Sequence, residues 1–107
     1  MLLFKKEHLE PIYSGLKTQT RRLWKKQRVK VGAIHQIKLK LFDKKNYGRV
    51  IITDVKKEKL LDITEEDAKS EGGYNRKTYL EKWFEITPSS PPNPEVFVVN
   101  FKFKKGE

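Results

Sequence analysis

The sequence is poor in the residue types that build covalent and metal-bound frameworks. It has no cysteine, which excludes a disulfide framework, a disulfide-linked partner and a zinc site built on thiolates. Only two histidines are present, His8 and His35, and the sequence identifies a partner for neither. No Walker-type loop, dinucleotide fingerprint or Ser-His-Asp set occurs. We therefore expect no metal site and no other cofactor.

Long apolar runs are also missing. The first residues, Met-Leu-Leu-Phe-Lys-Lys, are too short an apolar stretch for a signal peptide, and no later run approaches the length of a membrane span. We therefore expect a cytoplasmic protein that does not contact a membrane. We also expect a monomer. A length of 107 residues fits one domain, which we place over residues 1–107.

Positive charge, in contrast, is in excess. The formal net charge is +10, and residues 1–54 contain 14 Lys and Arg against 4 Asp and Glu, whereas residues 55–107 contain 10 of each. A field this one-sided favours a polyanionic partner, of which nucleic acid is the commonest. A solubilising surface, as in heat-adapted proteins rich in Lys and Glu, explains the same composition.

Apolar spacing and turn residues predict short helices and strands in the first half of the chain. We expect a strand at residues 2–4 and a helix of about two turns that ends before Gly15. Residues 36–41 alternate apolar and basic side chains, which predicts a strand with Ile37, Leu39 and Leu41 on its buried face. A hairpin loop at residues 43–48 then leads to a return strand at 50–55.

The second half adds two helices and a closing strand. Thr64 and Asn75 are expected to cap the helices, the second of which carries an apolar stripe of Leu80, Trp83 and Phe84. A proline-rich loop at 88–94 precedes a strand at 97–103. This order of elements in a short chain predicts an α+β fold, a small β-barrel or curled sheet with short helices at its ends.

The basic, threonine-rich segment after Gly15 is the first candidate site. Arg pairs bidentately with phosphate, and a Thr hydroxyl can bind phosphate or act as a nucleophile if a base is close. A helix end that delivers these side chains into a turn would form an anion pocket; a solvated edge strand is the alternative. The residues concerned are Lys17, Thr18, Thr20, Arg21 and Arg22.

Glu71 and Trp24 are two further candidate site residues. Glu71 falls at the end of the predicted helix, where an acidic group opposes the helix dipole, so a site role and a simple salt bridge to a lysine both remain open. Trp24, followed by Lys25 and Lys26, has the composition of a base-stacking surface, although large aromatic side chains more commonly pack inside.

Three motifs together resemble the ASCH (activating signal cointegrator homology) domain family. They are, in chain order, Ile12-x-x-Gly15-x-Lys17-Thr18-x-Thr20-x-Arg22, then Ile63-Thr64-Glu65-Glu66-Asp67-Ala68-x-x-Glu71-Gly72, and the closing strand Val96-Phe97-Val98-Val99-Asn100-Phe101. The resemblance implies a PUA-like β-barrel that binds RNA in a cleft lined by the Gly-x-Lys-Thr motif. The RNA or substrate contacts it suggests, together with the basic segment beside them, are Gly15, Thr18, Arg21, Arg22, Trp24, Lys25 and Lys26.

One branch of short, single-domain members hydrolyses N4-acetylcytidine to cytidine and acetate. By motif, the resemblance implies Lys17 as the base, Thr20 as the nucleophile and Glu71 as the proton donor, with Arg22 as a clamp. Our first hypothesis is therefore an RNA- or nucleoside-binding protein with a basic cleft, and the alternative is this amidohydrolase. The alternative has a geometric condition: on a flat strand Lys17 and Thr20 point to opposite faces, so the chain must turn between them.

Overall fold

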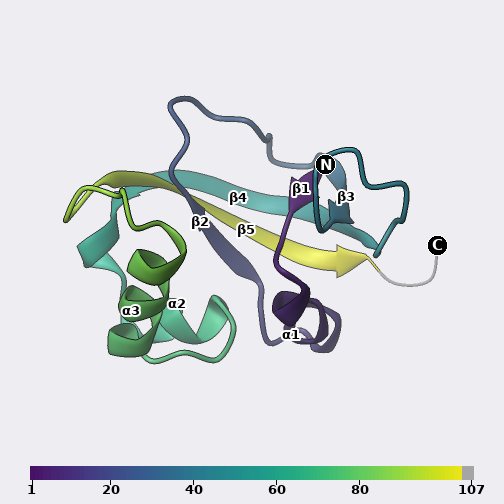
Figure 1. Cartoon of the computed structure of the whole chain (residues 1–107). Coiled ribbons are helices and arrows are strands. Elements are labelled where there is room, and N and C mark those ends of the chain that lie inside the picture. The colour runs from purple at the N-terminus through teal and green to yellow at the C-terminus, as the bar shows by residue number, and fades with distance from the viewer. Residues whose placement is uncertain (105–107) are drawn as a thin grey trace.

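The computed structural model describes residues 1–104, which form a five-stranded mixed sheet with short helices (Figure 1). The strand order is β1-β3-β4-β5-β2; β1 pairs with β3 in parallel, and the other pairs are antiparallel. In chain order the elements are β1 (Leu2–Leu3), the 3-10 turn η1 (Lys6–His8), α1 (Leu9–Ser14), β2 (Gln19–Arg22), β3 (Ile34–Lys38), β4 (Arg49–Lys59), the 3-10 turn η2 (Leu60–Asp62), α2 (Glu65–Ser70), α3 (Arg76–Ile86) and β5 (Glu95–Lys104).

The sheet is open, with the short strands β1 and β2 as its two edges. The α+β class is confirmed, but closure into a barrel is not, because no strand pairing joins β1 to β2 within residues 1–104. A side chain bridges these edges instead: Arg22 Nη2 donates a hydrogen bond to the Leu3 carbonyl at 2.7 Å. The gap between the edge strands is therefore spanned by a guanidinium group rather than by a ladder of backbone hydrogen bonds.

Two apolar clusters hold the helices against the sheet. One packs α1 and β1 onto the middle of the sheet around Ile12, Ile37 and Phe101; the other packs α2 and α3 onto β5 around Ala68, Trp83 and Val98. Figure 1 shows α1 beneath one part of the sheet and the α2–α3 pair beneath another. Strand β5 passes over both clusters, and its residues 96–99 are all buried.

Most of the predicted helix boundaries are confirmed, because they depend on local capping chemistry. Helix α1 ends at Gly15, which has the left-handed φ of +84° that glycine adopts without strain. Thr64 caps α2 and Asn75 caps α3, each through a capping box with the residue three positions later. Within residues 1–104, no helix combines the length and apolar character needed to cross a membrane.

The predicted strand over 36–41 is wrong in its second half. Strand β3 ends at Lys38, and Leu41 is 57% exposed, so the apolar face that alternation predicted stops after Ile37 and the half-buried Leu39. Lys38 is buried instead, and its Nζ donates to the carbonyl of Lys45 at 2.8 Å across the loop. Apolar and basic residues continue to alternate in the sequence after the point at which β3 no longer pairs with β4, so alternation alone predicted too long a strand.

Candidate functional site

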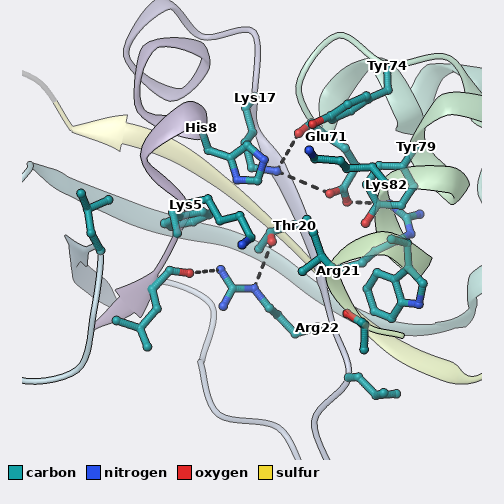
Figure 2. Close-up of a pocket in the computed structure, with 17 residues that line it drawn as sticks. Lys5, His8, Lys17, Thr20, Arg21, Arg22, Glu71, Tyr74, Tyr79 and Lys82 are labelled. Carbon is teal, nitrogen blue, oxygen red and sulfur yellow. Dashed lines mark hydrogen bonds and ion pairs between the residues drawn. The ribbon is translucent and has the colours of Figure 1, made fainter. Parts of the chain in front are cut away.

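A cleft of about 340 Å³ opens between the edge strands β1 and β2, the η1–α1 segment and the α2–α3 pair (Figure 2). Its walls combine apolar and aromatic side chains with a group of charged residues. The lining residues are Leu3, Phe4, Lys5, His8, Lys17, Thr20, Arg21, Arg22, Leu23, Leu39, Glu71, Tyr74, Tyr79, Lys82, Trp83, Ile86 and Thr87. Five of these are Lys or Arg and one is Glu, so basic side chains outnumber acidic ones in the lining.

Lys17 reaches the cleft from the turn that follows α1, not from a strand. Its backbone N–H donates to the Pro11 carbonyl at 2.9 Å, and β2 begins only at Gln19. The alternation rule that would separate Lys17 from Thr20 therefore does not apply, and both residues line the same cleft. The turn after Gly15 meets the geometric condition set by the sequence.

The Lys17 ammonium group is buried and fully engaged. Its Nζ donates to the backbone carbonyls of Gln19 at 3.0 Å and of Glu71 at 2.6 Å, and it lies 3.5 Å from Glu71 Oε1. The side chains of Lys17 and Glu71 are 3% and 2% exposed. Water is thus largely excluded from this ion pair, whose two charged groups lie in a low-dielectric site.

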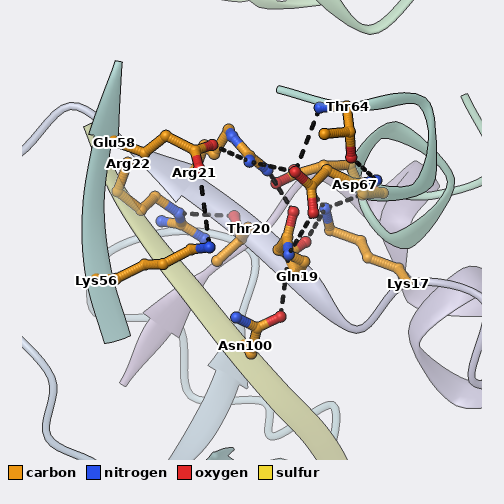
Figure 3. Close-up of polar contacts among 11 residues, drawn as sticks. Lys17, Gln19, Thr20, Arg21, Arg22, Lys56, Glu58, Thr64, Asp67 and Asn100 are labelled. Atoms are coloured by element: carbon orange, nitrogen blue, oxygen red, sulfur yellow. Dashed lines mark hydrogen bonds and ion pairs between the residues drawn. The ribbon is translucent and has the colours of Figure 1, made fainter. Parts of the chain in front are cut away.

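Glu71 is held from its other side by Arg21. Arg21 Nη1 donates to Glu71 Oε2 at 2.9 Å, while Nη2 donates to Glu58 Oε2 at 2.7 Å and contacts Asp67 Oδ2 at 3.4 Å. Figure 3 shows this network, in which Gln19 also accepts from Arg21 and bridges toward Asn100. The Arg21 side chain has no exposed surface, so its placement fits the positioning of Glu71 better than contact with RNA.

Thr20 and Arg22 lie together on the face of β2 that looks toward β1. Arg22 Nε donates to Thr20 Oγ1 at 3.1 Å, and its guanidinium carbon lies 5.0 Å from the centre of the Phe4 ring. Because the hydroxyl oxygen accepts from Arg22, its own hydrogen remains available to a base. Within residues 1–104 no hydrogen bond joins Lys17 to Thr20 directly.

Burial in the cleft lowers the pKa of three basic groups, Lys17, His8 and Arg22. Burial is the main cause that lowers the pKa of Lys17, and the charges of Arg22 and Arg21 add to it, while Glu71 opposes the shift. Burial, with the Lys17 charge, lowers the pKa of His8 to about 4. His8 is therefore neutral at physiological pH and can accept or donate a hydrogen bond in the cleft.

Aromatic side chains from α3 and from the segment before it also line the cleft. Tyr74 and Tyr79 meet edge to face with their centroids 5.7 Å apart, and the indole of Trp83 is anchored by a 3.1 Å bond from Nε1 to Ser90 Oγ. Burial and the Glu71 carboxylate raise the pKa of Tyr79, so its hydroxyl stays protonated. The cleft thus combines aromatic side chains, of which Tyr79 and Trp83 are largely buried, with hydrogen-bonding groups.

Several residues that the sequence nominated lie outside the cleft. Trp24 packs against the core with its ring 5.8 Å from that of Phe97, and Lys25 and Lys26 are exposed on the segment after β2. Gly15 and Thr18 support the site through the backbone: Gly15 makes the turn, and Thr18 N–H donates to the Ser70 carbonyl at 2.8 Å. This bond ties the start of β2 to the end of α2.

Sequence reasoning missed one side of the cleft. His8 lies in a segment where the sequence identifies no partner, and the apolar stripe of α3 predicts core alone, although Trp83 also lines the cleft. No motif singles out Tyr79 or Lys82. The available signal was helical spacing: Tyr79 lies four residues before Trp83, so the two share a helix face, and Lys82 directly precedes Trp83 at the border of that face.

Fold and cleft together define an α+β domain with a basic, aromatic-walled pocket beside an edge strand. The structure is similar to that of an ASCH domain from Lactobacillus crispatus JV V101, with a TM-score of 0.65 and 19% sequence identity over 89% of this chain and 69% of that one. It is also similar to protein EF3133 from Enterococcus faecalis V583, described under the family model DUF984, with a TM-score of 0.72 and 18% identity over 92% of this chain and 67% of that one.

These likenesses confirm that the chain has the fold of an ASCH domain structure, as the three motifs predicted. No family model and no curated protein matches the sequence.

Proposed function

We propose that this chain is an ASCH-domain protein whose cleft binds a nucleoside and hydrolyses an acyl amide on its base, as in N4-acetylcytidine. One observation carries the proposal: Lys17, Thr20, Arg22 and Glu71, which come from two distant segments, line a single cleft. Amide hydrolysis needs a nucleophile, a base and an acid within reach of one another, and scattered positions would have left only a scaffold.

Thr20 is the nucleophile in this scheme, and Arg22 prepares it. Oγ1 forms a bond to the acyl carbon as its proton passes to neutral Lys17, and the carbonyl oxygen becomes an oxyanion. The carbon–nitrogen bond then breaks as the leaving nitrogen takes a proton from Glu71, which leaves acetyl-Thr20 and the free base. The Arg22 bond to Oγ1 stabilises negative charge that develops on that atom.

The buried Lys17–Glu71 pair supplies both the base and the acid without a change in total protonation. A charged pair and a neutral pair differ only in which partner holds one proton, and the two groups are 3.5 Å apart. The neutral form is the reactive one, since it presents a free amine and a carboxylic acid. In the second half-reaction Glu71 takes a proton from water as the water attacks the acyl carbon, and Lys17 returns a proton to Thr20.

The size and walls of the cleft support a nucleoside-sized ligand. A volume of about 340 Å³ is at the lower end of the range for small-molecule pockets. Tyr74, Tyr79 and Trp83 offer aromatic surface for a base, and neutral His8 offers a hydrogen-bonding edge. Lys5 lines the cleft as well and would face a phosphate if the nucleoside belongs to an RNA chain, whereas Lys82 is paired with Glu7 and Glu85.

Incubation with N4-acetylcytidine, followed by chromatography for cytidine and acetate, tests the proposal. We expect Lys17→Met and Thr20→Val each to lower kcat/KM by about 10²- to 10⁴-fold, because each removes a proton-transfer partner or the nucleophile. Thr20→Ser, which keeps the hydroxyl, should retain measurable activity. Wild-type turnover that survives Lys17→Met and Glu71→Gln would contradict the residue assignment.

RNA binding is the second candidate function, and the surplus of 10 positive charges in residues 1–54 favours it. Both functions are compatible, since a cleft for a nucleoside can receive one that belongs to a chain. Phosphate contacts would make binding fall steeply with salt. Filter binding that stays weak at low ionic strength would exclude this candidate.

A further inference from the structure

The loop between β3 and β4 exposes apolar side chains outside the cleft. Phe42 is 89% exposed, the largest exposed fraction among the large apolar residues described, and the neighbouring Leu41 is 57% exposed. Figure 1 shows this loop at the end of the sheet beside β1, away from α2 and α3. Neither side chain contributes to the core, and together they form an exposed apolar pair on the surface.

The backbone holds Phe42 outward at a cost. Its φ of 62° is the one positive value among the non-glycine residues described, in the left-handed region that a bulky side chain rarely adopts. Hydrogen bonds fix the turn: Asp43 N–H donates to the Lys40 carbonyl at 3.2 Å, and Lys45 N–H donates to Asp43 Oδ1 at 3.1 Å. The ring is thus presented by an ordered turn, in a conformation that glycine would adopt more easily.

Lysines lie on both sides of Phe42 in the sequence. Lys40 and Lys44 are exposed and form no ion pair within residues 1–104, while Lys45 Nζ lies 4.9 Å from the Tyr47 ring centre. Asp43 is the single acidic residue of the loop, and a backbone N–H already engages its carboxylate. An exposed aromatic side chain with exposed lysines two residues before and after it has the composition that suits a chain that alternates bases with phosphates.

We propose that residues 40–45 form a platform for single-stranded nucleic acid, on which a base stacks against Phe42 while Lys40 and Lys44 contact the flanking phosphates. Leu39, directly before this loop, lines the cleft. A strand with one nucleoside in the cleft would therefore leave along the loop. Two apolar side chains bury little area for insertion into a bilayer, which argues against a lipid surface as the occupant. The platform locates the second candidate function and does not depend on amide hydrolysis.

Fluorescence anisotropy with a 5′-labelled 12-nucleotide oligouridylate tests the platform, with the matching DNA oligonucleotide as a second arm. We expect Phe42→Ala to weaken binding by about 5- to 100-fold, the effect of removing one stacking surface, and Phe42→Trp to preserve it. Phe42→Ala should leave the salt dependence unchanged. The Lys40→Gln/Lys44→Gln double variant should instead reduce the slope of log K against log salt by about 0.7 for each phosphate that the protein no longer neutralises.

Val31→Ala is the matched control, because Val31 is also exposed, at 62%, and lies outside this loop. It should bind as the wild type does. Phe42→Gly adds an independent check on folding: it should raise Tm by relieving the left-handed backbone while it weakens binding. Hydrolysis of free N4-acetylcytidine should be unaffected by Phe42→Ala, so a failure of the cleft chemistry and a failure of the platform are read separately.

Three results would overturn the platform. The first is an affinity of Phe42→Ala within twofold of the wild type for both oligonucleotides, and the second is no binding of either oligonucleotide by the wild type at low salt. The third is binding to phosphatidylcholine–phosphatidylglycerol vesicles that Phe42→Ala abolishes while oligonucleotide affinity stays the same. That last pattern would assign the loop to a membrane surface instead.

Discussion

Two basic segments lie close together in the sequence, but the fold buries charged side chains of one and leaves those of the other exposed. In the segment Lys17–Arg22, the side chains of Lys17 and Arg21 are buried and each positive group contacts a carboxylate. In the segment Lys25–Lys30, the four Lys and Arg side chains are exposed, and none forms an ion pair within residues 1–104. The amino-acid composition of the two segments does not predict this difference in burial.

The carboxylates that form ion pairs with the first segment come from far along the chain. Glu58 lies on β4, and Asp67 and Glu71 lie on or next to α2, so the charges become neutralised only when these elements pack on β2. A buried charge without such a partner is strongly destabilising, whereas an exposed one costs almost nothing. Both segments are basic, but only charged side chains of the first are buried, because carboxylates lie beside them.

The largest difference between the two segments should appear in stability when one arginine is removed. Arg21→Met leaves the Glu71 carboxylate buried without one of its two cationic neighbours, and we expect the free energy of unfolding to fall by about 3–5 kcal/mol. Arg28→Met is the matched control, since Arg28 is exposed and only overlies the Trp24 ring at 5.9 Å. It should cost less than about 1 kcal/mol. Urea denaturation measures both, and equal losses would erase the distinction.

A pH dependence should follow from His8, which faces the buried segment. Its pKa of about 4 in the folded protein lies below the ordinary value of 6.5, so the unfolded chain binds more protons between these values. Stability should fall as pH drops from 6.5 toward 4 and then level off. Because His8 is partly exposed, we expect a loss of about 1–2 kcal/mol.

Thermal unfolding of wild type and His8→Asn across about pH 4–7 measures this loss. The variant should lack that part of the pH dependence, while contributions from His35 and the carboxylates cancel in the difference. Parallel curves for the two proteins would show that the cleft does not hold His8 neutral.

A pair of glycines compares the two segments at the level of the backbone. Gly15 and Gly32 have φ of +84° and +89°, and an added Cβ would meet no atom within 4 Å at either position. Alanine at either site should cost about 1–2 kcal/mol from conformation alone. Gly15→Ala should also lower hydrolysis, because Gly15 sets the turn that delivers Lys17, whereas Gly32→Ala should not.

Denaturation and N4-acetylcytidine turnover, measured on the same preparations, separate the two effects. A loss of turnover in Gly32→Ala that matches the loss in Gly15→Ala would mean that activity follows general stability rather than the position of Lys17.

The smallest effect is expected in the exposed segment itself. Lys25→Gln/Lys26→Gln should change the unfolding free energy by less than about 0.5 kcal/mol and the hydrolysis rate by less than about twofold. If this segment contacts RNA, the salt slope of oligonucleotide binding should decrease while affinity for a free nucleoside stays the same. A large fall in hydrolysis would place these lysines in the cleft chemistry after all.

Local chemistry made much of the fold predictable, and long-range packing set the limit. The capping residues Thr64 and Asn75 and the turn at Gly15 act within a few residues, so the sequence indicates them directly. The end of β3 at Lys38 and the open edge between β1 and β2 depend on which strand is available to pair, which periodicity does not record. Barrel closure, which the order of elements and the family resemblance both favoured, has no counterpart in the strand pairing of residues 1–104.

The candidate site divides in the same way. The link from Lys17 and Thr20 to Glu71 was implied by the family resemblance, and all three residues line the cleft. The burial of Arg21 could not be seen in the sequence, because Glu58 stands in a strand of alternating charges and carries no motif. Trp24 satisfied the composition of a stacking surface, yet contact with Phe97 places it against the core.

Strand β5 carries a consequence for the order of folding events. It is the last described element along the chain, yet it pairs with both β4 and β2, and β2 has no other strand partner within residues 1–104. During synthesis, the residues around Lys17 therefore emerge long before the strand that fixes them. The cleft can be completed only once residues 95–104 pair with both β4 and β2, so its lining residues come together in one late step.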